Sequence, residues 1–140
     1  MKIFIPVLVF CLFVAMKADD ETERIYIQSL KLYLSVAKTD TVYVVKCFDI
    51  KLPSKAGKYF IIDIENSDRN LIKEKGSLYV IKFMPLELKK NTIEVTLVEF
   101  LVSEENNERL FQNLGSQTFS YKYEPALGKY KLIKRTKNTI

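Results

Sequence analysis

The spacing of apolar residues changes once along this chain, and that change restricts the fold more than any other feature. From Thr22 to Ala37 the apolar residues recur at helical spacing: they are Tyr26, Leu30, Tyr33, Leu34 and Ala37. Thr22 is a suitable N-cap residue, and the acidic residues around it favour the positive end of a helix. After residue 40 the pattern becomes alternating or continuously apolar, as in strands. The sequence therefore predicts one long helix followed by a sheet.

Proline, glycine and polar stretches divide the rest of the chain into short segments. We expect strands at Thr41–Cys47, Lys58–Ile64, Ser77–Met84, Thr92–Ser103, Leu110–Leu114, Gln117–Glu124 and Lys129–Lys134. The connections that we expect are a loop at Lys51–Gly57, a polar turn at Glu104–Glu108 and a hairpin turn at Pro125–Gly128. A short helix capped by Ser67 or Asp68 should end at Lys75, and Thr136–Ile140 should fray.

This order of elements predicts an α+β fold. The N-terminal helix would pack on a mostly antiparallel, twisted sheet of about six or seven strands. The short second helix would cover an edge or one end of that sheet. An NTF2-like or cystatin-like sheet is one version of this architecture, by analogy of element order, and a fold does not by itself define a function.

The first eighteen residues have the layout of a secretory signal. Lys2 supplies a charged start, residues 3–15 are almost entirely apolar, and Ala18 is a small residue before an acidic stretch. We therefore expect a signal peptide at residues 1–18 and a single exported α+β domain at residues 19–140, in the periplasm, at the cell surface or secreted. The apolar run is shorter than the roughly 20 residues of a membrane span, so no transmembrane segment should remain after cleavage.

The two cysteines bear on export and on stability. A retained signal anchor and a lipoprotein modified at Cys11 are alternatives to cleavage, but Phe10 is large for the residue before a lipidated cysteine. Cleavage would leave Cys47 alone, so packing rather than an internal disulfide would stabilise the domain. Because Cys47 ends an apolar run, we expect a buried thiol. The alternative is a dimer linked through Cys47.

The composition argues against an enzyme. The chain contains no histidine, the most frequent general base and metal ligand. Its four glycines form no phosphate-binding loop. The oxygen-rich stretch from Asp63 to Glu74 matches a calcium loop poorly, because Asp68 stands where a sharp turn needs glycine. We therefore expect no catalytic residues, no metal and no cofactor.

The C-terminal segment is the most suggestive surface in the sequence. Its basic residues, which could bind an anionic surface, are Lys122, Lys129, Lys131, Lys134 and Arg135. In the same segment the aromatic residues Phe119, Tyr121 and Tyr123 alternate with Ser120, Lys122 and Glu124. The simpler interpretation is that the aromatic side chains face a core, while the lysines are solvated and protect an edge strand. The net charge of +5 is too modest to indicate a specific nucleic-acid binder.

The same segment carries a resemblance. The run from Gly115 to Glu124, followed by Lys129-Tyr130-Lys131-Leu132, resembles the end of small exported Bacteroidetes-type proteins of unknown function. The front half, with its signal, helix and Asp40-Thr41-Val42-Tyr43-Val44, is similar to theirs. This resemblance implies a periplasmic or surface location and supplies no catalytic residues.

Two functions from different classes are compatible with the sequence. The first is an exported, non-catalytic binding or structural module, whose partner is an unknown protein or envelope component. The second is an NTF2-like pocket protein that binds or transforms a small ligand. In that case a carboxylate would lie in a cavity lined by Tyr33, Tyr43, Phe60 and Tyr79.

Overall fold

The computed structural model describes residues 21–37, 39–65 and 70–140 of the chain. The predicted signal peptide, residues 1–18, lies outside these ranges, as do Ser67 and Asp68, the predicted caps of the short helix. Residues 21–34 are helical, in agreement with the helical spacing of the sequence. Within the ranges described, no helix has both the length and the apolar character of a membrane span.

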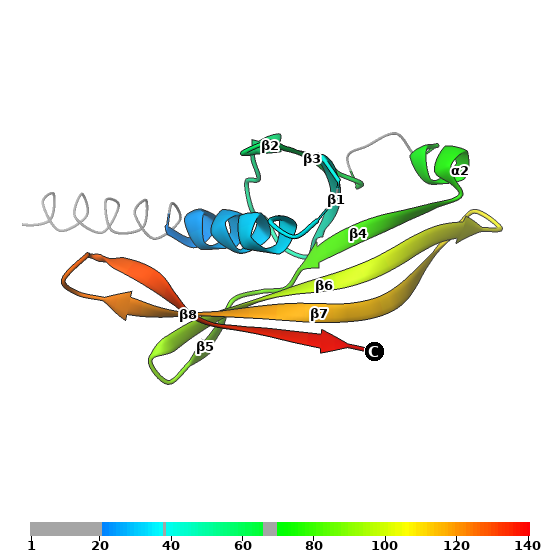
Figure 1. Ribbon diagram of the computed structural model, residues 1–140. Coiled ribbons are helices and arrows are strands. Elements are labelled where there is room, and N and C mark those ends of the chain that lie inside the picture. Colours follow the sequence, from blue (N-terminus) through cyan, green and yellow to red (C-terminus); the bar gives the residue numbers. More distant parts are fainter. Residues whose placement is uncertain (1–20, 38, 66–69) are drawn as a thin grey trace, which may run out of the picture.

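After this N-terminal helix, strands dominate the fold (Figure 1). They are β1 (Thr41–Lys46), β2 (Lys55–Ala56), β3 (Tyr59–Asp63), β4 (Ser77–Phe83), β5 (Glu87–Lys89), β6 (Thr92–Glu105), β7 (Glu108–Glu124) and β8 (Lys129–Thr139), with helix α2 (Leu71–Lys75) before β4. The sheet order is β2-β3-β1-β4-β6-β7-β8, and β5 pairs with β6. β1 runs parallel to β3 and β4, and the other pairings among the described strands are antiparallel. The predicted α+β class and mostly antiparallel sheet are confirmed.

Two hydrophobic clusters lie on opposite faces of this sheet. In β1, Val44 belongs to the cluster under the N-terminal helix, whereas the next residue, Val45, belongs to the cluster under α2. In β4, Ile81 and Val80 divide in the same way. Because successive side chains of a strand point to opposite faces, each helix covers a different face.

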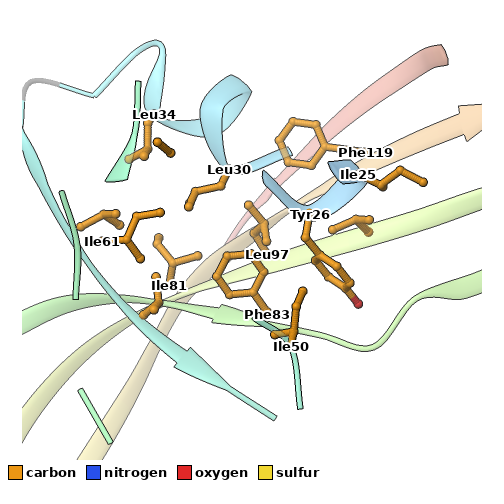
Figure 2. Packing of buried hydrophobic residues seen from close by; sticks show 14 of the residues in the cluster. Ile25, Tyr26, Leu30, Leu34, Ile50, Ile61, Ile81, Phe83, Leu97 and Phe119 are labelled. Carbon is orange, nitrogen blue, oxygen red and sulfur yellow. The ribbon is translucent and has the colours of Figure 1, made fainter. Parts of the chain in front are cut away.

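Aliphatic and aromatic side chains hold the N-terminal helix against the sheet. Tyr26, Leu30 and Leu34 are at most 1% exposed, as their spacing predicts. Figure 2 shows them packed against side chains of β3, β4 and β6. Two hydrogen bonds fix the position of the helix: the Tyr26 hydroxyl donates to the Met84 carbonyl oxygen at 2.8 Å, and the Tyr59 hydroxyl donates to the Leu34 carbonyl oxygen at 2.6 Å.

The long C-terminal strands differ from the prediction in continuity. The two strands expected at Leu110–Leu114 and Gln117–Glu124 form one strand, β7, with a register shift opposite Glu99 and Phe100. The prediction that Thr136–Ile140 fray is wrong as far as Thr139, because β8 continues until Thr139 pairs with Gly115. The polar turn shrinks to Asn106 and Asn107, whose positive φ angles of 52° and 64° suit a two-residue hairpin.

The buried position expected for Cys47 is also wrong. Cys47 is a free, exposed cysteine. β1 ends at Lys46, so Cys47 lies in a bend and no longer follows the alternation that buries Val45 two residues earlier. The loop expected at Lys51–Gly57 contains a short edge strand, since Lys55 and Ala56 pair with β3.

Candidate functional site

The strands β5 to β8 present a polar surface on the side of the sheet away from the N-terminal helix. In β6, Val95 and Leu97 point into the helix cluster and are fully buried. The alternate residues Glu94 and Thr96 therefore point to the opposite side. We call this surface the polar face; its polar members are Glu87, Lys89, Thr92, Glu94, Thr96, Ser116, Thr118, Ser120, Lys122, Glu124, Lys129, Lys131, Lys134, Thr136 and Asn138.

The strand register aligns the residues of the polar face in rows. One row crosses four strands, because Lys89 pairs with Thr92, Thr92 with Lys122, and Lys122 with Lys131. Three lysines and a threonine thus stand side by side, with about 5 Å between neighbouring strands.

A second row, one pleat further along the strands, mixes charges and hydroxyls. It runs from Glu94 through Ser120 to Lys134. The next row consists of Thr96, Thr118 and Thr136, and the hydroxyls of the first two lie 3.0 Å apart. The polar face is therefore positively charged toward one end and rich in hydroxyl groups toward its middle.

The structure places four of the five predicted basic residues on this one face. Lys122, Lys129, Lys131 and Lys134 share it, whereas Arg135 lies on the helix side. A register shift beside Ser120 and Tyr121 explains the difference, because the extra residue in β8 reverses the alternation that the sequence suggests.

Arg135 has partners of its own on the helix side of the sheet. Its guanidinium lies over the Phe119 ring, 5.5 Å from the centroid. It also donates two hydrogen bonds, of 2.9 Å and 2.6 Å, to the Gln117 side-chain oxygen. These contacts give Arg135 a packing role away from the polar face.

The end of β5 and the turn that follows it add two lysines that the sequence interpretation missed. Lys89 and Lys90 line a shallow hollow together with Asn91, Thr92, Lys122 and Ile133, which we call the basic hollow. β5 has little signature in the sequence, because this strand has three residues between Pro85 and a turn. The pairing of β5 with β6, in which Lys89 lies opposite Thr92, brings these lysines to the polar face.

Ion pairs occupy some of these lysines and leave others available. The Lys89 ammonium lies 2.6 Å from a Glu94 carboxylate oxygen and 3.2 Å from one of Glu87. The hydrogen bond from Lys89 lowers the pKa of Glu94, which keeps this carboxylate ionised. Lys131 lies 3.8 Å from Glu124. Lys122 and Lys134 form no close ion pair with another residue that the structure describes, and Lys134 acts on Glu94 only at longer range.

The predicted pocket residues do not line a common cavity. Tyr33 and Tyr79 lie on the helix side, where burial and then Glu99 raise the pKa of Tyr33. Tyr43 and Phe60 lie on the opposite side. Tyr43 pairs with Val80 of the α2 cluster, and Phe60 pairs with Thr41, which shares the face of Tyr43. The sheet therefore separates one pair from the other.

The outer pair also has lysine neighbours rather than a cavity around it. The Lys75 ammonium donates to the Tyr43 hydroxyl at 2.9 Å, and Lys55 lies over the Phe60 ring at 4.8 Å. Tyr79, on the other side, is 69% exposed. Across the described residues, no group of three or more His, Cys, Asp or Glu could hold a metal ion.

These features define a small α+β domain with a helix-covered core and a polar, lysine-bearing sheet face. Comparison of the chain with protein-family models, curated proteins and solved structures found no significant match. The resemblance to small exported Bacteroidetes-type proteins accordingly stays a prediction.

Proposed function

We propose that this protein is an exported, non-catalytic binding module whose polar face binds an anionic partner of the cell envelope. One observation carries the proposal: the register places Lys89, Lys122 and Lys131 in a single row across four strands. The signal-like sequence of residues 1–18 supports export.

The physical argument depends on the number of charges rather than on any single one. A pair of opposite charges 4 Å apart in water is worth about 1 kcal/mol, so one exposed lysine binds weakly. Among the described residues, the polar face and the basic hollow together carry six lysines against the three glutamates Glu87, Glu94 and Glu124. An extended anion that meets several lysines at once gains a sum of such terms and releases its counterions. Binding should therefore weaken steeply with salt.

The residue types on the polar face support binding rather than catalysis. Ammonium and hydroxyl groups donate hydrogen bonds to an anion. The hydroxyls of Thr96 and Thr118 are engaged with each other, and no histidine exists anywhere in the chain to activate one as a nucleophile.

The experiment measures affinity for inorganic polyphosphate, a simple linear anion. We expect the exported chain, residues 19–140, to bind it at low salt. The triple variant Lys122→Gln, Lys131→Gln, Lys134→Gln should lose about 100-fold in affinity, or roughly fivefold per lysine. Both this variant and its control carry Cys47→Ser to prevent intermolecular disulfides.

The control has the same change in charge on another part of the surface. It combines Lys51→Gln, Lys55→Gln and Lys58→Gln, three exposed lysines around β2. This variant should bind polyphosphate within about twofold of the parent. Equal losses in the two triple variants would show that net charge alone attracts the anion and would contradict the proposal.

We propose further that the α+β fold has an NTF2-like or cystatin-like architecture. The long, bent strands β6 and β7, with a helix over one face, support it (Figure 1). In such an architecture the domain would bind its partner through the polar face, and the side of the sheet under the N-terminal helix would be its core. A crystal structure that superposes on neither fold would remove this part of the proposal.

A further inference from the structure

Two turns project from the same end of the sheet, beside the row of lysines. Thr92 begins β6 directly after the Lys90–Asn91 turn, and it pairs with Lys122, two residues before the end of β7. The hairpin between β7 and β8, at 125–128, therefore lies near the β5–β6 turn, as Figure 1 shows at the left of the molecule. We call this region, with the basic hollow, the basic end.

The basic end also exposes large apolar side chains. Leu127, in the β7–β8 turn, is 56% exposed. Ile133 is 54% exposed and lines the basic hollow beside Lys89 and Lys122. The register shift in β8 leaves Ile133 without a cross-strand partner, which turns an aliphatic residue toward the lysines. Leu88 is 78% exposed but pairs with Ile93, so it points to the opposite side of the sheet from Lys89 and is not part of this surface.

This combination selects among anionic partners. A soluble polyanion would engage the lysines and leave Leu127 and Ile133 in water. A bilayer with acidic lipids offers a negative surface to the lysines and an apolar boundary a few ångströms below it to the aliphatic side chains. The lysines and the apolar residues occupy the same end of the sheet, so a planar surface can meet them together.

We infer that the basic end docks the domain on the surface of a bilayer that contains acidic phospholipid, with Lys90 and Lys122 at the headgroups and Leu127 and Ile133 at the acyl boundary. This inference rests on the proposed function, because it names the anionic partner of the same lysines. It requires no change in the fold, since the turns already project beyond the sheet.

The test is co-sedimentation of the exported chain, residues 19–140, with vesicles. One set contains phosphatidylglycerol and phosphatidylcholine, and the other contains phosphatidylcholine alone. We expect binding to the first set, with at least tenfold weaker partitioning to the second and a loss of binding at high salt.

Two variants separate the charged from the apolar contribution. Lys90→Gln with Lys122→Gln should reduce partitioning about 25-fold, or roughly fivefold per lysine. Leu127→Ser with Ile133→Ser should reduce it about tenfold or more, because both side chains lose their contact with the acyl boundary. Circular dichroism verifies that each variant is folded.

The apolar control uses exposed residues far from the basic end. Val36 follows the N-terminal helix and is 73% exposed, and Leu110, near the β6–β7 turn, is 46% exposed. Val36→Ser with Leu110→Ser should leave partitioning unchanged.

Polyphosphate binding by the same variants distinguishes the two proposals. If Leu127→Ser with Ile133→Ser lowers vesicle binding but not polyphosphate binding, docking on the bilayer is supported. If the chain binds polyphosphate but not acidic vesicles, or if the apolar pair has no effect on vesicles, the bilayer inference is wrong and the proposed function stands. If it binds neither, both are wrong.

Discussion

Ser29 and Tyr121 form a buried pair that connects the N-terminal helix to β7. The Ser29 hydroxyl oxygen lies 2.8 Å from that of Tyr121, and the Ser29 hydroxyl also lies 2.9 Å from the Ile25 carbonyl oxygen. When Ser29 donates to that carbonyl, Tyr121 donates to Ser29. The two residues are both fully buried, so neither has water as a substitute partner.

Removing the Ser29 hydroxyl should therefore lower the free energy of unfolding more than removing the Tyr121 hydroxyl. Ser29→Ala leaves the buried Tyr121 hydroxyl without its hydrogen-bond acceptor and should lower the free energy of unfolding by about 1–3 kcal/mol. Tyr121→Phe leaves Ser29 bonded to the Ile25 carbonyl and should cost about 0.5–1.5 kcal/mol. Urea unfolding of both single variants and of the double variant measures this. If the double variant loses as much unfolding free energy as the two single variants together, the two hydroxyls do not interact and the prediction is contradicted.

Single residues also show where sequence interpretation reaches its limit. Helical spacing predicted that Leu30 and Leu34 are buried, but it could not predict the burial of Ser29, whose partner is 92 residues away. The simpler interpretation of the C-terminal aromatics holds for Phe119 and Tyr121, which are fully buried. It does not hold for Tyr123, which is 47% exposed because it lies near the hairpin turn.

At the scale of elements, β7 and the end of β8 approach each other closely at Gly115. Its φ of 139° belongs to a region that favours glycine, and a Cβ there would lie 2.5 Å from the Asn138 carbonyl oxygen. Gly115→Ala should destabilise the domain by roughly 3 kcal/mol and separate the end of β8 from β7.

Gly128 provides the matched control, since its φ is also positive, at 61°, but a Cβ would meet nothing within 4 Å. Gly128→Ala should cost only about 1 kcal/mol. Amide exchange should speed up at residues 136–139 in the Gly115 variant alone. Similar exchange and similar unfolding free energies in the two variants would show that the close approach to Asn138 does not matter.

The strand alternation at the start of Thr92–Ser103 was readable from the sequence, because apolar Ile93, Val95 and Leu97 alternate with polar residues. The pairings were not, since they depend on contacts between distant segments. The register shift in β8 is the clearest case: it moves Arg135 to the helix side and brings Lys134 to the polar face. The local pattern carries no signal for such an extra residue. Lys89 and Lys90 were missed for another reason, because the three residues of β5 are too few to form a pattern.

For the whole molecule, buried tyrosines predict how stability depends on pH. Burial raises the pKa of Tyr26 to about 12, and it also raises the pKa values of Tyr33 and Tyr121. A group whose pKa is raised by folding stabilises the native state fully below its unfolded pKa, here 10.0, and loses that contribution as the pH rises toward the folded value.

The free energy of unfolding should therefore fall between pH 10 and about pH 12, by about 2–3 kcal/mol from Tyr26 alone. Urea titrations across this window measure the decline. Tyr26→Phe should show a shallower decline than the parent chain, because phenylalanine cannot ionise. A free energy that stays constant through the window would contradict the burial of these hydroxyls.

The central claim is that the polar face is the surface through which this protein binds, and chemical-shift mapping tests it most directly. Polyphosphate is added to isotope-labelled chain, residues 19–140, and each backbone amide is followed. We predict that the largest shifts fall at Lys89–Thr92, around Lys122 and at Lys131–Lys134. Shifts concentrated around Lys51, Lys55 and Lys58, or spread evenly over all exposed lysines, would contradict the claim.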